Sequence, residues 1–383
     1  MSRKTLKIAY VCADPGIPVF GSKGASVHIQ EVVRQMLEKG HEVTVFALKK
    51  GTEIPADLAA LPVREYPLPA AVKADPAARE TAQIEAVQQM ARDIIQERYA
   101  VVYERYSLFS SALKVIRENL LGSKLILEVN APLIEEQRKH RILVQADQAQ
   151  ACLTDQVSAA DVIICVSDPV TAWVQATVPN YAHKVYTVNN GVNPKRITAQ
   201  PEANEVIVTF VGTLKPWHGL HDLLKAYALK ETSWKLRIIG SGPEENDLRQ
   251  QAHELGLNVE FLGAVPPQEM PRALAGSAIG VAPYPSPHSP EEHYFSPLKI
   301  YEYLAAGLAV VATDVADIPE LLEGCGIVVS ASNPLALANA IDNLATNPAL
   351  RQQLQSQARE TAVAKHSWAQ AVDRIFTLAG VTP

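Results

Sequence analysis

The residues best suited to chemistry lie in one segment, SPLKIYEYLAAG. Ser296 is a favourable cap before a helix and Pro297 a favourable first helical residue, so we expect a helix to begin here. Lys299 then falls in the first turn, where the helix dipole disfavours a cation unless an anion is bound. A lysine beside free backbone N–H groups is typical of a phosphate site. Glu302, on the same side of the helix, has oxygens that can accept hydrogen bonds from a ribose diol.

The same segment has a second interpretation, which is a Lys299–Glu302 ion pair on an exposed helix. The neighbouring residues Tyr301, Tyr303 and Leu304 carry no charge. Charged side chains are rarely buried without a partner. We therefore favour the phosphate site.

A second candidate is the loop VGTLKPWHG, which follows an apolar run and begins with Gly212 and Thr213. Lys215 and His218 are able to hold a diphosphate here, since lysine is an effective point charge for phosphate. The alternative is an ordinary strand-to-helix loop with a solvated lysine and a packing tryptophan.

A third candidate is the loop GSKGAS, which contains Gly24 and precedes an apolar helical pattern. Glycines allow a ligand to approach the backbone, and a helix start favours an anion. The spacing matches neither GxGxxG nor a P-loop, and a plain turn is an open alternative. His28, one turn into the helix, is interpreted either as a site residue or as a solvated histidine.

The elements that position these loops alternate between strand-like and helix-like segments, which predicts α/β architecture with parallel sheets. The polar segment 190–205 interrupts the alternation and is interpreted as a linker. We expect domains at 1–195 and 206–366, with a C-terminal helix at 367–383. The predicted strands are 6–13, 42–48, 100–103, 124–129, 161–166, 184–188, 206–211, 235–239, 259–262, 279–282, 309–312 and 327–329. Ligands in such doubly wound sheets bind beyond the carboxyl ends of the strands, in a cleft between the two domains.

Length and composition narrow the class of protein. A chain of 383 residues exceeds one ordinary domain, and its net charge of -6 argues against a nucleic-acid partner. The four cysteines (Cys12, Cys152, Cys165 and Cys325) have no metal-site spacing. Cys12 and Cys165 lie in apolar runs and are interpreted as buried hydrophobic residues of a cytoplasmic protein. We expect no metal site and no transmembrane helix.

The segments in this order resemble a retaining glycosyltransferase of the GT-B fold, family 4. The resemblance runs almost from end to end of the chain. It includes the glycine loop, the Asn190-Gly191-Val192 turn, and the segments FVGTLKPWHG, IIGSGPEENDLRQQAHELGL, VEFLGAVP and FSPLKIYEYLAAGLAVVATD. It implies two Rossmann-like domains facing across a cleft, with the acceptor on the N-terminal domain and the sugar nucleotide on the C-terminal one.

The resemblance also implies residue roles. Glu302 binds the nucleotide ribose, backbone N–H groups near Ser296, Pro297 and Leu298 hold the diphosphate, and Val265 lies near the base. The final helix, 367–383, returns to the first domain. We place His28, Arg105, Asn130 and Glu135 on the acceptor side, although a structural ion pair or cap is an open alternative for the last three.

The sequence departs from the family pattern at four positions. Tyr294 stands where the family commonly has the first of two glutamates. Thr213 and His218 replace an arginine and a lysine of the phosphate loop, and Asn130 replaces a histidine. We expect Lys215 and Lys299 to supply the missing charge.

The implied reaction moves a hexosyl unit from a nucleotide-sugar, with UDP favoured over GDP, to an acceptor hydroxyl with retention of configuration. The acceptor is a carbohydrate, a lipid-linked compound or a small molecule. No cofactor is implied, since the nucleotide-sugar is a substrate. The alternatives are a nucleotide-sugar epimerase and a non-catalytic binding protein. The basic run 138–141 permits weak contact with an anionic membrane surface, although we favour a solvated helix face, since four basic residues are at the lower limit for membrane contact.

Overall fold

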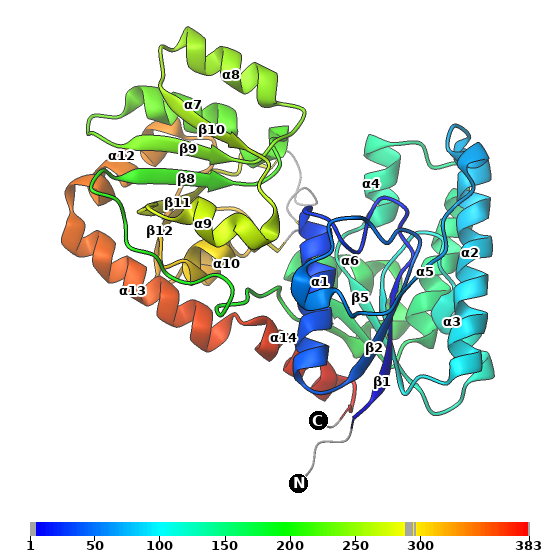
Figure 1. The fold of residues 1–383 in the computed structure, drawn as a ribbon. Coiled ribbons are helices and arrows are strands. Elements are labelled where there is room, and N and C mark those ends of the chain that lie inside the picture. Colours follow the sequence, from blue (N-terminus) through cyan, green and yellow to red (C-terminus); the bar gives the residue numbers. More distant parts are fainter. Residues whose placement is uncertain (1–4, 288–293, 295, 382–383) are drawn as a thin grey trace. The chain divides into compact units, whose positions relative to one another are not determined.

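The computed structural model describes residues 5–287, 294 and 296–381, which form two compact units (Figure 1). Unit 1 comprises Met1–Asn189, Tyr294–Ser296 and Ala371–Pro383. Unit 2 comprises Asn190–His293 and Pro297–Gln370. The chain therefore passes between the units more than once, and helix α14 (Trp368–Leu378) begins in unit 2 and continues in unit 1.

Unit 1 is built on a parallel seven-stranded sheet with the order β3-β2-β1-β4-β5-β6-β7. Its strands are β1 (Lys7–Cys12), β2 (Glu42–Ala47), β3 (Val63–Glu65), β4 (Val101–Arg105), β5 (Lys124–Val129), β6 (Val162–Cys165) and β7 (Val185–Thr187). The six strands predicted in this half are confirmed. The sequence missed β3, because this short edge strand carries the exposed Arg64 and Glu65 and has no apolar run.

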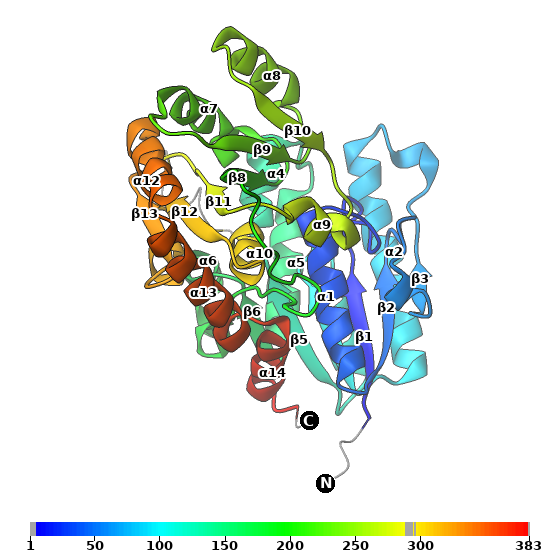
Figure 2. The same ribbon diagram turned by 60° about the vertical axis from the view of Figure 1, so that its left-hand side comes forward.

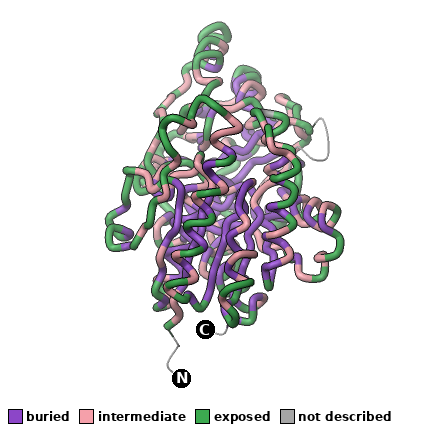
Figure 3. Tube along the Cα trace, turned by 90° about the vertical axis from the view of Figure 1, so that its right-hand side faces the viewer, coloured by how far each residue is buried: buried purple, intermediate pink, exposed green. Residues whose placement is uncertain are grey.

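Helices cover both faces of this sheet. They are α1 (Gly24–Glu38), α2 (Pro76–Glu97), α3 (Ala112–Asn119), α4 (Leu133–His140), α5 (Ala146–Ala159) and α6 (Asp168–Thr177). The main core packs one face of β1, β4 and β5 against α2, α3 and α5, whereas α1 lies on the opposite face (Figure 1). The strands form the buried interior, and the outer turns of the helices are exposed (Figure 3).

Unit 2 repeats the plan with a parallel six-stranded sheet in the order β10-β9-β8-β11-β12-β13. Its strands are β8 (Ile207–Val211), β9 (Lys235–Ile239), β10 (Val259–Gly263), β11 (Ile279–Ala282), β12 (Ala309–Thr313) and β13 (Gly326–Val329). All six were predicted, although β9 (KLRII) and β10 (VEFLG) carry charged residues among their apolar ones.

The helices of unit 2 again lie on two faces. They are α7 (Leu220–Leu229), α8 (Glu245–Glu254), α9 (Met270–Leu274), α10 (Leu298–Ala305), α11 (Ile318–Leu321), α12 (Pro334–Thr346) and α13 (Pro348–Lys365). The core on one face contains α7, α8 and α12, and α10 lies against the other face (Figure 2). Each sheet is thus covered in the doubly wound, Rossmann-like manner.

The polar segment 190–205 is held against α13 within unit 2. Arg351 binds Glu202 through two hydrogen bonds of 3.0 and 2.8 Å. Arg359 donates to the carbonyl groups of Ile197 and Pro194, both at 2.8 Å. Two arginines thus replace the regular hydrogen bonds that this irregular segment lacks.

Candidate functional site

The segment with Lys299 and Glu302 forms helix α10, but the helix begins one residue later than predicted. Pro297 is the cap residue and Leu298 the first helical residue, and no side-chain hydrogen bond caps the helix. The prediction of Ser296 as cap and Pro297 as first residue is therefore wrong, because the backbone of Pro297 (ψ 84°) is not helical. Ser296 and Pro297 are buried beside the helix start, and Lys299 is the second residue of α10.

Lys299 is buried in an aromatic setting. Its side chain is 8% exposed, and its Nζ lies 4.4 Å from the ring centre of Phe210 and 4.7 Å from that of Tyr284. Among the residues that the structure describes, Nζ has no hydrogen-bond partner. Burial lowers the pKa of Lys299 to about 7, although Glu302 opposes this shift. The alternative of an exposed surface helix is wrong, because this helix face is buried.

Gly212 leaves open the space beside this amine. It follows the end of β8 and has a positive φ of 149°, which favours glycine. A Cβ atom at this position would lie 3.3 Å from both Nζ and Cε of Lys299. The end of β8 and the start of α10 therefore meet at the buried Nζ of Lys299.

His218 packs against the same two aromatic rings. It ends a short 3₁₀ turn, Pro216–His218, with ring centres 6.0 Å from Phe210 and 5.9 Å from Tyr284. Its Nδ1 donates to the Thr213 carbonyl, since a carbonyl can only accept. Burial, with help from Lys299 and Lys215, lowers the pKa of His218 to about 3. The ring is therefore neutral at neutral pH, and its Nε2 carries a lone pair.

The rest of the loop is more open. Lys215 is half-buried, with Nζ 4.4 Å from the ring centre of Trp217. Trp217 is 44% exposed, and its ring packs against the Lys215 amine and the His218 ring, as the packing tryptophan considered from the sequence does. Thr213 is exposed, and Glu302 is half-buried on α10.

Val265 stands apart from the Lys299 cluster. It is half-buried in the loop after β10, and β9 separates β10 from β8. The structure thus brings together Lys299, His218 and Gly212. It places Val265 at another strand end of the same sheet edge.

Sequence reasoning missed Phe210 and Tyr284, the aromatic residues of this site. Phe210 lies within β8 and Tyr284 two residues after β11, and these strands are neighbours in the sheet. Aromatic residues at the carboxyl ends of adjacent strands were the available signal. It becomes visible only when the strand order is known.

A second polar cluster lies in unit 1 at the carboxyl ends of β1, β4 and β5. His28 is 2% exposed, its Nε2 lies 3.0 Å from Oε1 of Glu128, and its Nδ1 lies 3.3 Å from Nη1 of Arg105. Arginine can only donate, so Nδ1 accepts and the ring proton lies on Nε2, the nitrogen nearer to Glu128. The interpretation of His28 as a solvated residue is therefore wrong.

Glu128 was missed by sequence reasoning because it lies within the otherwise apolar strand KLILEV. Burial disfavours its charge, but His28 and Arg105 outweigh burial and hold the pKa of Glu128 below its usual value. Arg105 and Glu128 are partners in the β4–β5 register, so strand pairing explains their contact. The stacked rings of Tyr10 and Tyr103, 5.3 Å apart, lie on the same face.

The other two residues predicted on the acceptor side, Asn130 and Glu135, lie in different environments. Asn130 follows β5, and its buried Oδ1 has no hydrogen-bond partner among the described residues. Glu135 is exposed in the first turn of α4. The structure therefore joins His28 with Arg105 and leaves Glu135 at the surface.

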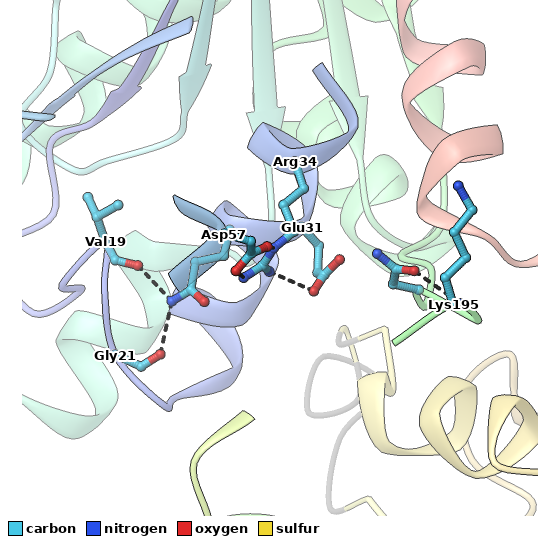
Figure 4. Close-up of polar contacts among 8 residues, drawn as sticks. Val19, Gly21, Glu31, Arg34, Asp57 and Lys195 are labelled. Atoms are coloured by element: carbon cyan, nitrogen blue, oxygen red, sulfur yellow. Dashed lines mark hydrogen bonds and ion pairs between the residues drawn. The ribbon is translucent and has the colours of Figure 1, made fainter. Parts of the chain in front are cut away.

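The glycine loop before α1 is held by the helix that follows it. Gln30 donates to the carbonyl groups of Val19 (3.0 Å) and Gly21 (3.1 Å) (Figure 4). One turn further on, Arg34 binds Glu31 and Asp57. Gly24 is the first residue of α1 and is exposed, so nothing beyond a turn is required to explain it.

Tyr294 is held in unit 1. Its hydroxyl binds Glu136 of α4, its carbonyl accepts from Ser167 at 2.7 Å, and its ring packs on the main core. Tyr294 therefore has a structural role in unit 1, at the position where the family commonly has a glutamate.

The remaining predictions concern the basic run, membrane helices, metal sites and cysteines. Arg138, Lys139 and Arg141 are exposed, as a solvated helix face requires. No helix among the described residues is long and apolar enough to cross a membrane. In the same part of the chain, no three His, Cys, Asp or Glu residues are grouped to hold a metal ion. All four cysteines are buried, and burial raises the pKa of Cys12 to about 12.

Comparison with known proteins identifies both halves of the chain. Residues 22–196 match the family described as Glycosyltransferase Family 4, and residues 205–347 match the family described as Glycosyl transferases group 1. The putative teichuronic acid biosynthesis glycosyltransferase TuaH of Bacillus subtilis is 30% identical, over 42% of this chain and 42% of that protein. Spore coat protein SA of Bacillus subtilis is 23% identical over 97% of this chain and 99% of that protein.

A solved structure supports the fold. The crystal structure of Anabaena Alr3699/HepE in complex with UDP has a TM-score of 0.73, with 18% identity over 98% of this chain and 100% of that chain. The chain thus carries glycosyltransferase domains of the group 1 and family 4 type, in the GT-B architecture of two Rossmann-like domains.

Proposed function

We propose that this chain is a retaining glycosyltransferase that moves a hexosyl unit from a nucleotide-sugar, a UDP-sugar by preference, to an acceptor hydroxyl. The observation that carries the proposal is the buried Lys299 amine at the start of α10, aimed beside Gly212 without a hydrogen-bond partner among the described residues. A buried amine without a hydrogen-bond partner is costly, so its retention favours a bound anion.

The comparisons support the choice of donor. The HepE structures are complexes with UDP and with UDP-glucose. The matched families and TuaH are described as glycosyltransferases. An epimerase or a non-catalytic binding protein explains the phosphate site equally, but neither is favoured by these relatives.

In the proposed reaction the diphosphate leaves as the sugar–oxygen bond breaks. Lys299, Lys215 and the first N–H groups of α10 stabilise its growing negative charge. A phosphate oxygen takes the proton of the acceptor hydroxyl, so no protein nucleophile is needed. Glu302 accepts hydrogen bonds from the ribose of the nucleotide. Because lysines supply the positive charge, we expect activity without a divalent metal.

His218 is less able to bind the diphosphate than the sequence suggested. In the ligand-free protein its ring is neutral and its Nδ1 proton is used by Thr213. It can stabilise a diphosphate only after Nε2 gains a proton. On the acceptor side, we place the hydroxyl substrate near Arg105, Asn130 and the His28–Glu128 pair of unit 1.

The first test is isothermal titration calorimetry with UDP, GDP and ADP, without added metal. We expect one nucleotide, UDP first, to bind clearly better than the others. Lys299→Met and Glu302→Gln should each weaken this binding roughly 10- to 100-fold, since each removes a charge-assisted hydrogen bond worth about 1.5–3 kcal/mol. Lys225→Met, on the exposed side of α7, is the matched control and should bind like the wild type.

The second part of the test separates the three functions. A transferase releases nucleoside diphosphate only when an acceptor is present and gives a product with the donor's anomeric configuration. An epimerase converts the nucleotide-sugar without an acceptor, and a binding protein gives no product. Failure of all three nucleotides to bind would remove the proposal.

A further inference from the structure

Two nitrogen bases of this site, Lys299 and His218, lie beside the rings of Phe210 and Tyr284. The Lys299 amine lies between the faces of Phe210 and Tyr284 and has no acceptor among the described residues. An ammonium ion in this position loses its water and gains only cation–π attraction, which does not replace hydration. The geometry therefore favours the uncharged amine while the site is empty.

The charges around Lys299 do not reverse this preference. Glu302, on the same helix, favours the ammonium form. The loop after β8 brings Lys215 and His218, of which Lys215 is a cation. Tyr284 comes from the loop after β11, and Tyr303 of α10 uses its hydroxyl to bind Val211 and Val281. Asp317, before α11, acts on Tyr284. Burial therefore outweighs the attraction of Glu302 and lowers the pKa of Lys299 to about 7.

His218 also lacks a positive charge in the empty site, for a different reason. Its one proton is on Nδ1, where the Thr213 carbonyl accepts it, so Nε2 offers a lone pair rather than a donor. Neither nitrogen base is therefore fully charged at neutral pH before a ligand arrives. A diphosphate bound at the end of β8 and the start of α10 supplies the missing negative charge.

We propose that the donor's diphosphate enters this site together with a proton, which converts the Lys299 amine to the ammonium ion that binds it. The inference rests on the proposed function and predicts how donor affinity depends on pH. The amine takes one proton from solvent when the donor binds, and the proton is released when the nucleoside diphosphate leaves. Donor affinity is then lost progressively as the pH rises above about 7.

The test is calorimetry with UDP in two buffers of different ionisation enthalpy, which gives the number of protons taken up. At pH 8 the terminal phosphate of UDP is already ionised, since its pKa is about 6. We expect uptake of roughly half a proton or more at pH 8, because the buried amine is then largely uncharged in the free protein. The dissociation constant should rise by up to about tenfold per pH unit between pH 7 and 9.

Lys299→Arg tests the assignment to this side chain. Arginine stays protonated, so this variant should bind UDP without proton uptake and with an affinity that does not change between pH 7 and 9. Lys225→Met should keep the proton uptake of the wild type. Circular dichroism checks that the arginine variant is folded. If it is not folded, the proton uptake measured for the wild type tests the inference.

The outcomes separate the two proposals. UDP binding without proton uptake, or uptake that persists in a folded Lys299→Arg variant, would overturn the inference and leave the glycosyltransferase proposal in place. A wild-type protein that binds none of UDP, GDP and ADP would overturn the proposed function itself. Uptake that is present in the wild type and lost in Lys299→Arg would support both.

Discussion

Glu104 is a carboxyl group that the fold keeps away from water. It lies on β4 with no exposed surface, its Oε1 accepts from Ser110, and its Oε2 has no hydrogen-bond partner among the described residues. Burial raises its pKa to about 7, although hydrogen bonds from Ser110 and from the Leu113 backbone oppose the shift. Between pH 4.5 and 7 the unfolded chain has lost this proton while the folded chain still holds it, so stability falls as the pH rises through this window.

Glu104→Gln removes this pH dependence. We expect the variant to be more stable than the wild type at pH 8, by on the order of 1–3 kcal/mol, and similar to it near pH 4.5. Urea denaturation at both pH values measures the difference. A stability difference that is the same at pH 4.5 and pH 8 would contradict the assignment of Glu104 as a carboxyl group that stays protonated in the fold.

At the scale of residues, the sequence selected candidates that break a local rule. Lys299 was chosen because a cation in the first turn of a helix is unusual, and Glu302 because of its spacing from Lys299. Phe210, Tyr284 and Glu128 were missed, because their importance comes from neighbours on other strands. His28 had two interpretations, and only the β5 partner Glu128 decides between them.

At the scale of elements, the loop that carries His218 is fixed by close backbone contacts. Gly219 has a φ of +70°, and a Cβ atom there would lie 1.7 Å from the Pro283 carbonyl oxygen. We expect Gly219→Ala to destabilise the protein by roughly 2 kcal/mol or more, since it adds this clash to the strain of a left-handed residue. It should also weaken UDP binding, because the displaced turn carries His218 and Lys215. Thermal unfolding and calorimetry measure the two effects.

Gly256 offers the matched control for that variant. Its φ is +64°, but a Cβ atom there has no neighbour within 4 Å. Gly256→Ala should therefore cost only the backbone strain, about 1 kcal/mol, and leave UDP binding unchanged. Equal losses in the two variants would show that the contact with Pro283 is unimportant.

Helices and strands could be predicted from the sequence where their own residues carry the pattern, without help from neighbouring elements. Strands such as Lys124–Val129 and Lys235–Ile239 were predicted with their observed bounds, since most of their buried positions hold apolar residues. Strand β3 has no such run, because it is a short edge strand. The start of α10 was misplaced by one residue, since Pro297 is equally suited to the cap and to the first turn.

At the scale of the whole molecule, the candidate donor residues belong to one unit. Lys299, His218, Gly212 and Glu302 all lie in unit 2, whereas the His28–Arg105–Glu128 cluster lies in unit 1. Hydrogen exchange measured by mass spectrometry can therefore follow each group of residues separately. It reports on local opening of the backbone, which a ligand suppresses where it binds.

We expect UDP alone to slow exchange in unit 2, in the segments 212–219 and 297–303 that begin at Gly212 and Pro297. Strand ends of unit 1, at 105–111 and 129–135, should change only when an acceptor and donor are both present. Lys299→Met should abolish the effect of UDP, and Lys225→Met should leave it intact. Protection of the unit 1 segments by UDP alone would contradict the assignment of donor and acceptor to separate units. Protection restricted to unit 2 would instead make the His28–Arg105–Glu128 cluster the first place to search for the acceptor.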